Sequence, residues 1–159
     1  MTSLHPMAED SFSAYRIASA RGYADENVTS GRWPSEGAFE RALEDFDQSL
    51  PQGLNTPENY IFEIKCEPSQ ETVGVLWFAV VENNGIKSAF VYDVEVGVEH
   101  RRQGHARAAF VLLEPIVEGL HLQSIGLHVF NRNVGAQALY RSLGYEVTSV
   151  NMLKHLQPK

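Results

Sequence analysis

The stretch Arg101-Arg102-Gln103-Gly104-His105-Ala106-Arg107 closely follows a strand-like run at residues 92–98 and stands at the start of a helical pattern. A basic, glycine-containing turn in this position offers free backbone N–H groups, the positive end of a helix dipole and guanidinium groups. Residues 99–107 contain three Arg, two His and one Glu, a local charge of +2 with His neutral, whereas the whole chain has a formal net charge of −7. The pattern therefore predicts a strand–loop–helix unit whose loop binds an anionic, phosphate-bearing ligand.

Gly104 is the residue of this loop that should tolerate replacement least. A side chain there would obstruct a phosphate that approaches the backbone amides. The loop alone leaves one alternative open, which is a solvated helix N-terminus with ordinary surface arginines. We expect His100 and His105 to be phosphate-side or surface residues.

The apolar pattern on either side of the loop predicts the remaining elements. Alternating or continuous apolar runs predict strands at residues 3–5, 60–66, 73–81, 89–98, 124–130 and 145–153. Helical spacing predicts helices at residues 9–28, 35–50, 106–120 and 134–143, the second of them capped by Ser35. Pro115 should kink or shorten the third helix, and Asn83-Asn84-Gly85 predicts a tight hairpin turn. The order predicts a mixed α/β fold in which a crossover helix makes the strands on either side of it parallel.

The composition limits the class of protein. A chain of 159 residues that is 43% hydrophobic is expected to form one soluble domain. An acidic balance, with a pI near 5.3, disfavours nucleic-acid and membrane binding and suits a cationic substrate. The single Cys66 excludes an intramolecular disulfide framework and a cysteine-rich zinc site, and we expect no metal. Because no transmembrane-length run or signal-peptide pattern is present, the predicted compartment is the cytoplasm.

The run at residues 89–98 carries two carboxylates that could act as a general base. Strand alternation places Asp93 and Glu95 on one face. The same alternation predicts an apolar opposite face made by Phe90, Tyr92, Val94, Val96 and Val98. The alternative reading of the two carboxylates is the solvated side of an antiparallel strand.

A second motif follows the run at residues 124–130, and it changes the interpretation. Asn133, Ala136, Leu139, Tyr140, Gly144 and Tyr145 fit the pattern Asn-x-x-Ala-x-x-Leu-Tyr followed by Gly-Phe/Tyr. Arg101, Gly104 and Ala106 fit Arg/Gln-x-x-Gly-x-Gly/Ala about 30 residues earlier. The two motifs together resemble the GNAT superfamily of acetyl-CoA-dependent N-acetyltransferases. The resemblance is strong over residues 89–154 and looser over the N-terminal helices.

The resemblance implies a fold and a cofactor site. The fold is a mixed, mostly antiparallel central sheet with helices on both faces and a splayed strand pair that receives the pantetheine arm. Residues 1–57 would form the acceptor side, and residues 58–159 the sheet core with the CoA motifs, in a single domain spanning 1–159. The residues implied in acetyl-CoA binding are Val96, Gly97, Val98, Arg101, Arg102, Gln103, Gly104, His105, Ala106, Arg107, Asn133 and Tyr140.

The resemblance also implies a mechanism, in which an amine attacks the thioester directly within a ternary complex. Glu95 or Asp93 would remove the proton of the amine, an N–H near Val96 would stabilise the oxyanion, and Tyr140 would protonate the thiolate. Tyr140 could instead be a packed helix aromatic. The acceptor would be a small-molecule, peptide or protein amine, and the protein a monomer or homodimer. The competing function is a non-catalytic acyl-CoA-binding or regulatory module on the same fold.

Overall fold

The structure, a computed structural model, describes residues 1–157 and divides into two compact units, Met1–His128 and Val129–Lys159. The first unit contains β1 (Thr2–Pro6), α1 (Phe12–Thr29), α2 (Ala38–Ser49), β2 (Asn59–Cys66), β3 (Glu71–Asn83), β4 (Ile86–Val96), α3 (His105–Gly119) and β5 (Ile125–Leu127). The second unit contains α4 (Val134–Ser142). Short 3-10 turns lie at Glu9–Ser11, Gly53–Asn55 and Val98–His100. Across residues 1–157, the longest helices are too short or too polar to pass through a bilayer.

The first unit is built on a five-stranded sheet in the order β1-β2-β3-β4-β5. All neighbours are antiparallel except β4 and β5, which are parallel and joined through α3. Asn84 and Gly85 both have positive φ, as the predicted hairpin turn between β3 and β4 requires. The predicted mixed, mostly antiparallel fold is therefore confirmed.

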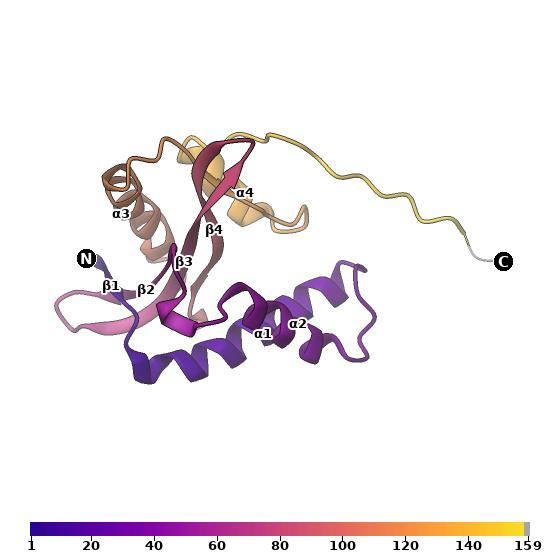
Figure 1. Ribbon diagram of the computed structural model, residues 1–159, viewed down its shortest axis with the longest axis horizontal. Helices are drawn as coiled ribbons and strands as arrows, with labels where there is room; N and C mark the ends of the chain where they lie inside the picture. The colour runs from indigo at the N-terminus through magenta and orange to yellow at the C-terminus, as the bar shows by residue number, and fades with distance from the viewer. Residues whose placement is uncertain (158–159) are drawn as a thin grey trace. The chain divides into compact units, whose positions relative to one another are not determined.

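The helices lie on both sides of this sheet, with α3 on one side and α1 and α2 on the other (Figure 1). Tyr15, Phe46, Leu50, Ile61 and Trp77 form the core on the α1/α2 side. The alternate residues of β2 and β3, among them Phe78, Leu76 and Ile64, are fully buried on the opposite face, where Phe110 and Leu113 of α3 are also fully buried. Each face thus has its own apolar core.

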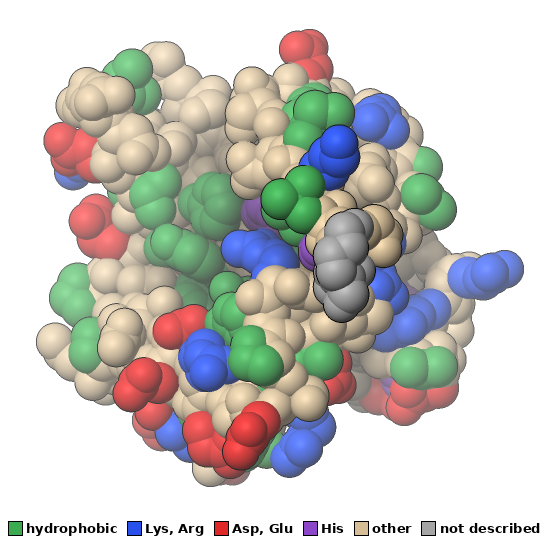
Figure 2. All heavy atoms as spheres, turned by 90° about the vertical axis from the view of Figure 1, so that its right-hand side faces the viewer, with side chains coloured by type: hydrophobic (Ala, Val, Ile, Leu, Met, Phe, Trp, Pro, Cys, Tyr) green, Lys and Arg blue, Asp and Glu red, His purple; other side chains and the backbone are tan. Residues whose placement is uncertain are grey.

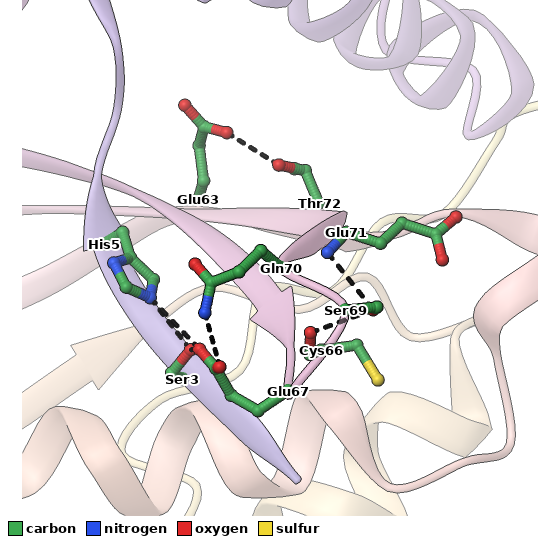
Figure 3. A network of polar contacts seen from close by, with 9 residues as sticks. All are labelled: Ser3, His5, Glu63, Cys66, Glu67, Ser69, Gln70, Glu71 and Thr72. Carbon is green, nitrogen blue, oxygen red and sulfur yellow. Dashed lines mark hydrogen bonds and ion pairs between the residues drawn. The ribbon is translucent and has the colours of Figure 1, made fainter.

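The edge of the sheet is held by a polar cluster that joins β1 to the turn after β2 (Figure 3). The Ser3 hydroxyl donates to Glu67 Oε2 at 2.5 Å, and Gln70 Nε2 donates to Glu67 Oε1. His5 Nε2 lies 3.5 Å from Glu67 Oε2. Because both oxygens of this carboxylate are satisfied within the cluster, its role is structural.

Two predicted helix features differ from the structure. The residue that caps α2 is Gly37, with φ of 73°, and not Ser35. Pro115 lies inside α3 without ending it, although it lacks an N–H for the helix. Leu113 and Val117 on either side of Pro115 are buried, so packing against the sheet holds that turn in the helix.

The predicted last strand is wrong. Residues 145–157 contain no strand, and Val147 and Val150 in this segment are exposed. Alternating apolar residues make a segment compatible with a strand, but a strand also needs a neighbour to complete its hydrogen bonds. No described strand pairs with residues 145–153. The strand predicted at residues 124–130 is shorter than expected, since β5 covers only Ile125–Leu127.

The predicted division of β4 into two faces is also partly wrong. The register between β3 and β4 shifts so that Phe78 lies opposite Val91, whereas Trp77 lies opposite Asp93. Tyr92 is therefore the extra residue of a β-bulge, and its ring packs against Trp77 at a centroid distance of 5.0 Å. Phe90 and Tyr92 consequently lie on the same side of the sheet as Asp93. Strict alternation could not reveal this, because the extra residue reverses the pattern beyond it.

Candidate functional site

The predicted phosphate loop lies between the end of β4 and the start of α3. Gly104 directly precedes α3 and has φ of 83°, in the left-handed region that favours glycine. A Cβ at Gly104 would have no neighbouring atom within 4 Å. The backbone conformation therefore favours glycine, and the space above it is open. Open space over the first amides of a helix is what an approaching phosphate needs.

The arginines of the loop have different environments. Arg101 donates from Nε to the Val96 carbonyl at 2.9 Å and from Nη2 to Glu95 Oε2 at 2.8 Å. Arg101 therefore ties the loop to the end of β4. Arg102 is exposed, has φ of 64° and makes no ion pair within residues 1–157. Arg107 is exposed on the first turn of α3. Arg102 is thus better placed than Arg101 for a diphosphate.

His105 differs from its prediction as a phosphate-side or surface residue. Its side chain is only 5% exposed, and Nδ1 lies 2.9 Å from the Thr2 hydroxyl. Since α3 packs against β1, the first residue of this helix faces the sheet. Its Nε2 is buried without a hydrogen-bond partner in the described part of the chain. Only the backbone of His105 remains suited to a ligand at the helix N-terminus.

The end of β4 presents an unpaired edge. The ladder between β4 and β5 ends, within the described residues, at the pair Val91–Leu127. The Gly97 N–H donates to Val73 of β3 at 2.8 Å, so the alternation of an antiparallel ladder turns the N–H and C=O of Val96 toward the opposite edge. The Val96 carbonyl accepts a hydrogen bond from Arg101, and the Val96 N–H points to the edge of β4 that lies beyond the ladder with β5. Within the described residues this edge of β4 is therefore unpaired beyond Val91, while a splay that receives the pantetheine arm stays a prediction.

A cleft of about 1020 Å³ lies between α1, α2 and the neighbouring face of β3 and β4. Its walls are aromatic and acidic. The lining residues that matter for the chemistry are Tyr15, Ser19, Trp77, Tyr92, Asp93 and Glu95. Both carboxylates predicted from the strand pattern therefore face one cavity, together with the aromatic side chains on either side of the bulge.

Asp93 is the half-buried carboxylate of this cleft. The Tyr15 hydroxyl donates to Asp93 Oδ2 at 2.8 Å, and Ser19 Oγ lies 3.5 Å from the same oxygen. Burial raises the pKa of Asp93 to about 6, and the nearby charge of Glu95 also raises it, while the Tyr15 hydrogen bond opposes the shift. A carboxylate in this state is ionised near neutral pH and can take up a proton just below it.

Tyr15 and Ser19 were not predicted as site residues. Tyr15 is 8% exposed, and burial is the main reason that its pKa is raised well above 10, with the charge of Asp93 adding to the effect. Its hydroxyl therefore remains a donor. The only sequence signal was a pair of hydroxyl side chains four residues apart on an otherwise apolar helix stripe. The two hydroxyls could not be assigned to the site from this signal, because their role depends on the contact with Asp93 in the folded chain.

Glu95 is more exposed than Asp93, although it lies only two residues away on the same face. It forms an ion pair with Arg101 at 2.8 Å.

A third carboxylate on the same sheet face, that of Glu63, is buried. It accepts hydrogen bonds from the Ala8 N–H at 2.9 Å and from the Thr72 hydroxyl at 2.8 Å. Burial alone would raise the pKa of Glu63, but these hydrogen bonds outweigh it and the pKa is lowered. Among these three carboxylates only Asp93 is both desolvated and inclined to bind a proton.

The second motif lies in the second unit and is described within it. Asn133 caps α4, and its Oδ1 accepts from the Ala136 N–H at 3.2 Å. This cap explains the Asn and Ala of the motif locally, as a helix N-terminus. Tyr140 lies on α4 with its ring 5.9 Å from that of Tyr145. Catalytic and cofactor roles for Asn133 and Tyr140 stay predictions.

Comparison with known proteins identifies the class. Residues 21–145 match the acetyltransferase (GNAT) family. The chain is 31% identical over 153 residues to YycN of Bacillus subtilis (strain 168), described as an uncharacterized N-acetyltransferase, covering 96% of this chain and 97% of the relative. It is 31% identical over 154 residues to YdgE of the same organism, also described as an uncharacterized N-acetyltransferase, covering 97% and 98%. The crystal structure of YycN superposes with a TM-score of 0.93 at 30% identity, covering 99% of this chain and 100% of that one.

The chain therefore belongs to the GNAT family and is an acetyltransferase.

Proposed function

We propose that this acetyltransferase transfers an acetyl group from acetyl-CoA to a primary amine, by direct attack within a ternary complex. The observation that carries the proposal is Asp93, a half-buried carboxylate with a pKa of about 6 in a cleft beside the open end of β4. A proton acceptor in this state suits an amine substrate, which must lose a proton to react.

The residues present fit acetyl-CoA. The backbone amides of residues 103–107 stand at the N-terminus of α3, with open space above Gly104 and with Arg102 and Arg107 exposed nearby. These groups would hold the diphosphate, and the edge of β4 around Val96 would bind the pantetheine arm as an added strand does. When bound, acetyl-CoA supplies the acetyl group as an activated thioester.

Asp93 would accept the proton of the amine, directly or through a water molecule. A primary amine with a pKa of about 10 is protonated at neutral pH, so a proton must leave before the nitrogen can attack. Glu95 is a weaker candidate, because its carboxylate is exposed and paired with a guanidinium. Tyr15 would keep Asp93 in place through its hydrogen bond.

Two further groups would act on the developing negative charge. The Val96 N–H at the unpaired edge would donate to the oxygen of the acetyl carbonyl as charge gathers there. Tyr140 would give its proton to the departing thiolate, a role that rests on its place in the family motif.

The proposal is tested by binding and turnover. Acetyl-CoA should raise the melting temperature, because it binds only the folded chain, and an amine panel should release free thiol in its presence. Tyr140→Phe keeps the ring and should lower turnover about 10²–10⁴-fold with little change in acetyl-CoA affinity. The absence of any thermal shift or binding heat at millimolar acetyl-CoA would refute the cofactor assignment. Unchanged turnover in Tyr140→Phe would return this tyrosine to a packing role.

A further inference from the structure

The cleft has a one-sided charge. Among the described residues that line it there are five carboxylates and no Lys, Arg or His; the carboxylates belong to Asp25, Glu26, Asp45, Asp93 and Glu95. Figure 2 shows acidic side chains gathered over the lower part of the face, at the level of α1 and α2 in Figure 1. Carboxylates that share a cleft with low-dielectric walls focus their field inside it and attract cations.

Three of these carboxylates have no partner among the described residues. Glu95 pairs with Arg101, and Asp93 accepts from Tyr15. Asp25, Glu26 and Asp45 form no ion pair or side-chain hydrogen bond within residues 1–157. By contrast Asp47, outside the cleft lining on the same helix as Asp45, accepts two hydrogen bonds of 2.7 Å from Arg16. Three acids of the cleft lining therefore have no ion pair within residues 1–157, whereas Asp47 outside the lining is paired.

The position of Asp25 and Glu26 points to a ligand. They lie in the last two turns of α1, which ends at Thr29 and has no basic residue in its last turn. The C-terminus of a helix carries a partial negative charge, so acidic side chains there weaken the helix and a bound cation would benefit from the same field. A local arrangement that costs stability without compensation inside the protein is typical of a functional site.

The two acidic ends of the cleft lie a defined distance apart. Ser19 contacts Asp93, and Glu26 comes seven residues later on the same helix, a rise of about 10 Å. The wall between them is formed partly by the rings of Tyr23, Phe46 and Tyr92, of which Tyr23 and Tyr92 are exposed. Aromatic surface suits an aliphatic chain and also attracts cations.

We propose that the acceptor is an amine with a second positive charge at the far end of an aliphatic spacer, that is, a diamine or polyamine. The reacting nitrogen lies at Asp93, the spacer crosses the aromatic wall, and the second ammonium is held by Asp25, Glu26 and Asp45. This assignment rests on the proposed function, because it takes the cleft as the acceptor site.

A matched pair of probes tests the second charge. The probes 1,8-diaminooctane and octylamine differ only in the second ammonium group. The triple variant Asp25→Asn/Glu26→Gln/Asp45→Asn removes the three unpaired carboxylates. The control Glu36→Gln/Glu40→Gln/Glu44→Gln removes three exposed charges on or beside α2 that do not line the cleft. Both variants change the net charge equally, so any difference in binding between them results from where the removed carboxylates lie.

Binding is measured first, by calorimetry in the absence of acetyl-CoA, so that it does not depend on turnover. The diamine should bind the wild type at least about tenfold more tightly than octylamine, since several weak ion pairs each contribute about two- to fivefold. The triple variant should abolish this preference and the control should keep it. Equal affinity for the two probes, or equal loss in both variants, would overturn the proposal.

Turnover then separates this inference from the proposed function. In the triple variant the KM for the diamine should rise about tenfold while kcat and the octylamine KM stay unchanged. Its melting temperature should not fall, because two of the removed charges oppose the helix dipole. If both probes are acetylated equally well by all three proteins, the proposed function stands and the dication assignment fails. If the diamine binds as expected but no thiol is released from acetyl-CoA, the cleft binds dications and the proposed acetyl transfer to them is wrong.

Discussion

The two faces of the sheet differ in what covers them, although the same strands form both. On the α3 face, the side chains of Leu76 and Phe78 from β3 and of Phe110 and Leu113 from α3 are all fully buried. On the α1/α2 face, a largely aromatic core lies beside an open cleft that contains Asp93. Both faces therefore bury apolar side chains, but the cleft face also holds a desolvated carboxylate, which lowers stability when it is ionised.

The sharpest test of this division is Asp93→Asn. If Asp93 is the proton acceptor, turnover should fall about 10²–10⁴-fold. The folded-state pKa of Asp93, about 6, lies above the ordinary 3.8, so ionisation costs the folded state free energy, and this cost appears as pH rises through 4 to 6 and is complete above it. The variant should therefore be more stable than wild type at pH 7, by on the order of 1–3 kcal/mol, and similar at pH 3.5.

Glu95→Gln is the matched control for that variant, because it removes a carboxylate from the same face of the same strand. We expect a loss of turnover below about tenfold, since Glu95 is exposed and paired with Arg101. A larger loss in Glu95→Gln than in Asp93→Asn would make Glu95 the base.

Leu113→Ala tests the other face. Leu113 is fully buried in α3, so the truncation should lower the free energy of unfolding by about 2–5 kcal/mol. Denaturant unfolding measures this loss. The turnover of the folded fraction at low temperature should match wild type, and a large loss of kcat in a folded variant would show that the two faces are not separable.

Gly104→Val tests the loop that links the two faces. A β-branched residue in the left-handed region costs about 1–2 kcal/mol and places a side chain in the open space above the α3 amides. Acetyl-CoA affinity should fall by about tenfold or more, measured by calorimetry, while the Asp93 side of the cleft still binds amines. An unaltered acetyl-CoA affinity in the folded variant would remove the loop from the cofactor site.

The smallest expected effect belongs to Tyr15→Phe. The Tyr15 hydrogen bond lowers the pKa of Asp93, so its removal should move the acid limb of the profile of kcat/KM against pH to higher pH, by about one unit or less. Above the limb, turnover should be nearly unchanged. Tyr23→Phe removes a hydroxyl from the same helix and cleft without touching Asp93, and should leave the profile where it was.

Much of the α3 side could be predicted from the sequence because its signals are local. The helix stripe that includes Phe110, Leu113 and Val117, the turn at Asn84-Gly85 and the basic loop before α3 all follow from spacing within a few residues. The final strand was predicted wrongly by the same reasoning, because alternation is a property of a single segment, whereas a strand also needs a neighbouring strand to pair with.

The cleft could be predicted only in part. Strand periodicity placed Asp93 and Glu95 on one face, but it could not rank them as bases. Their environments are set by the β-bulge, by the Arg101 guanidinium and by α1, which lies far from them in the sequence. Tyr15 acquires its role through a hydrogen bond to a residue 78 positions away. Likewise, the sequence predicted His105 as a phosphate-side or surface residue, because its burial depends on the packing of α3 against β1.

The sequence by itself determined the family, the order of most elements and the position of the basic loop before α3, because motifs and periodicity are properties of neighbouring residues. Only the tertiary structure decided which carboxylate loses its water, which arginine is tied to the strand end and which acids stay unpaired. Desolvation and pairing depend on what the fold places around a charge, and that surrounding comes from distant parts of the chain.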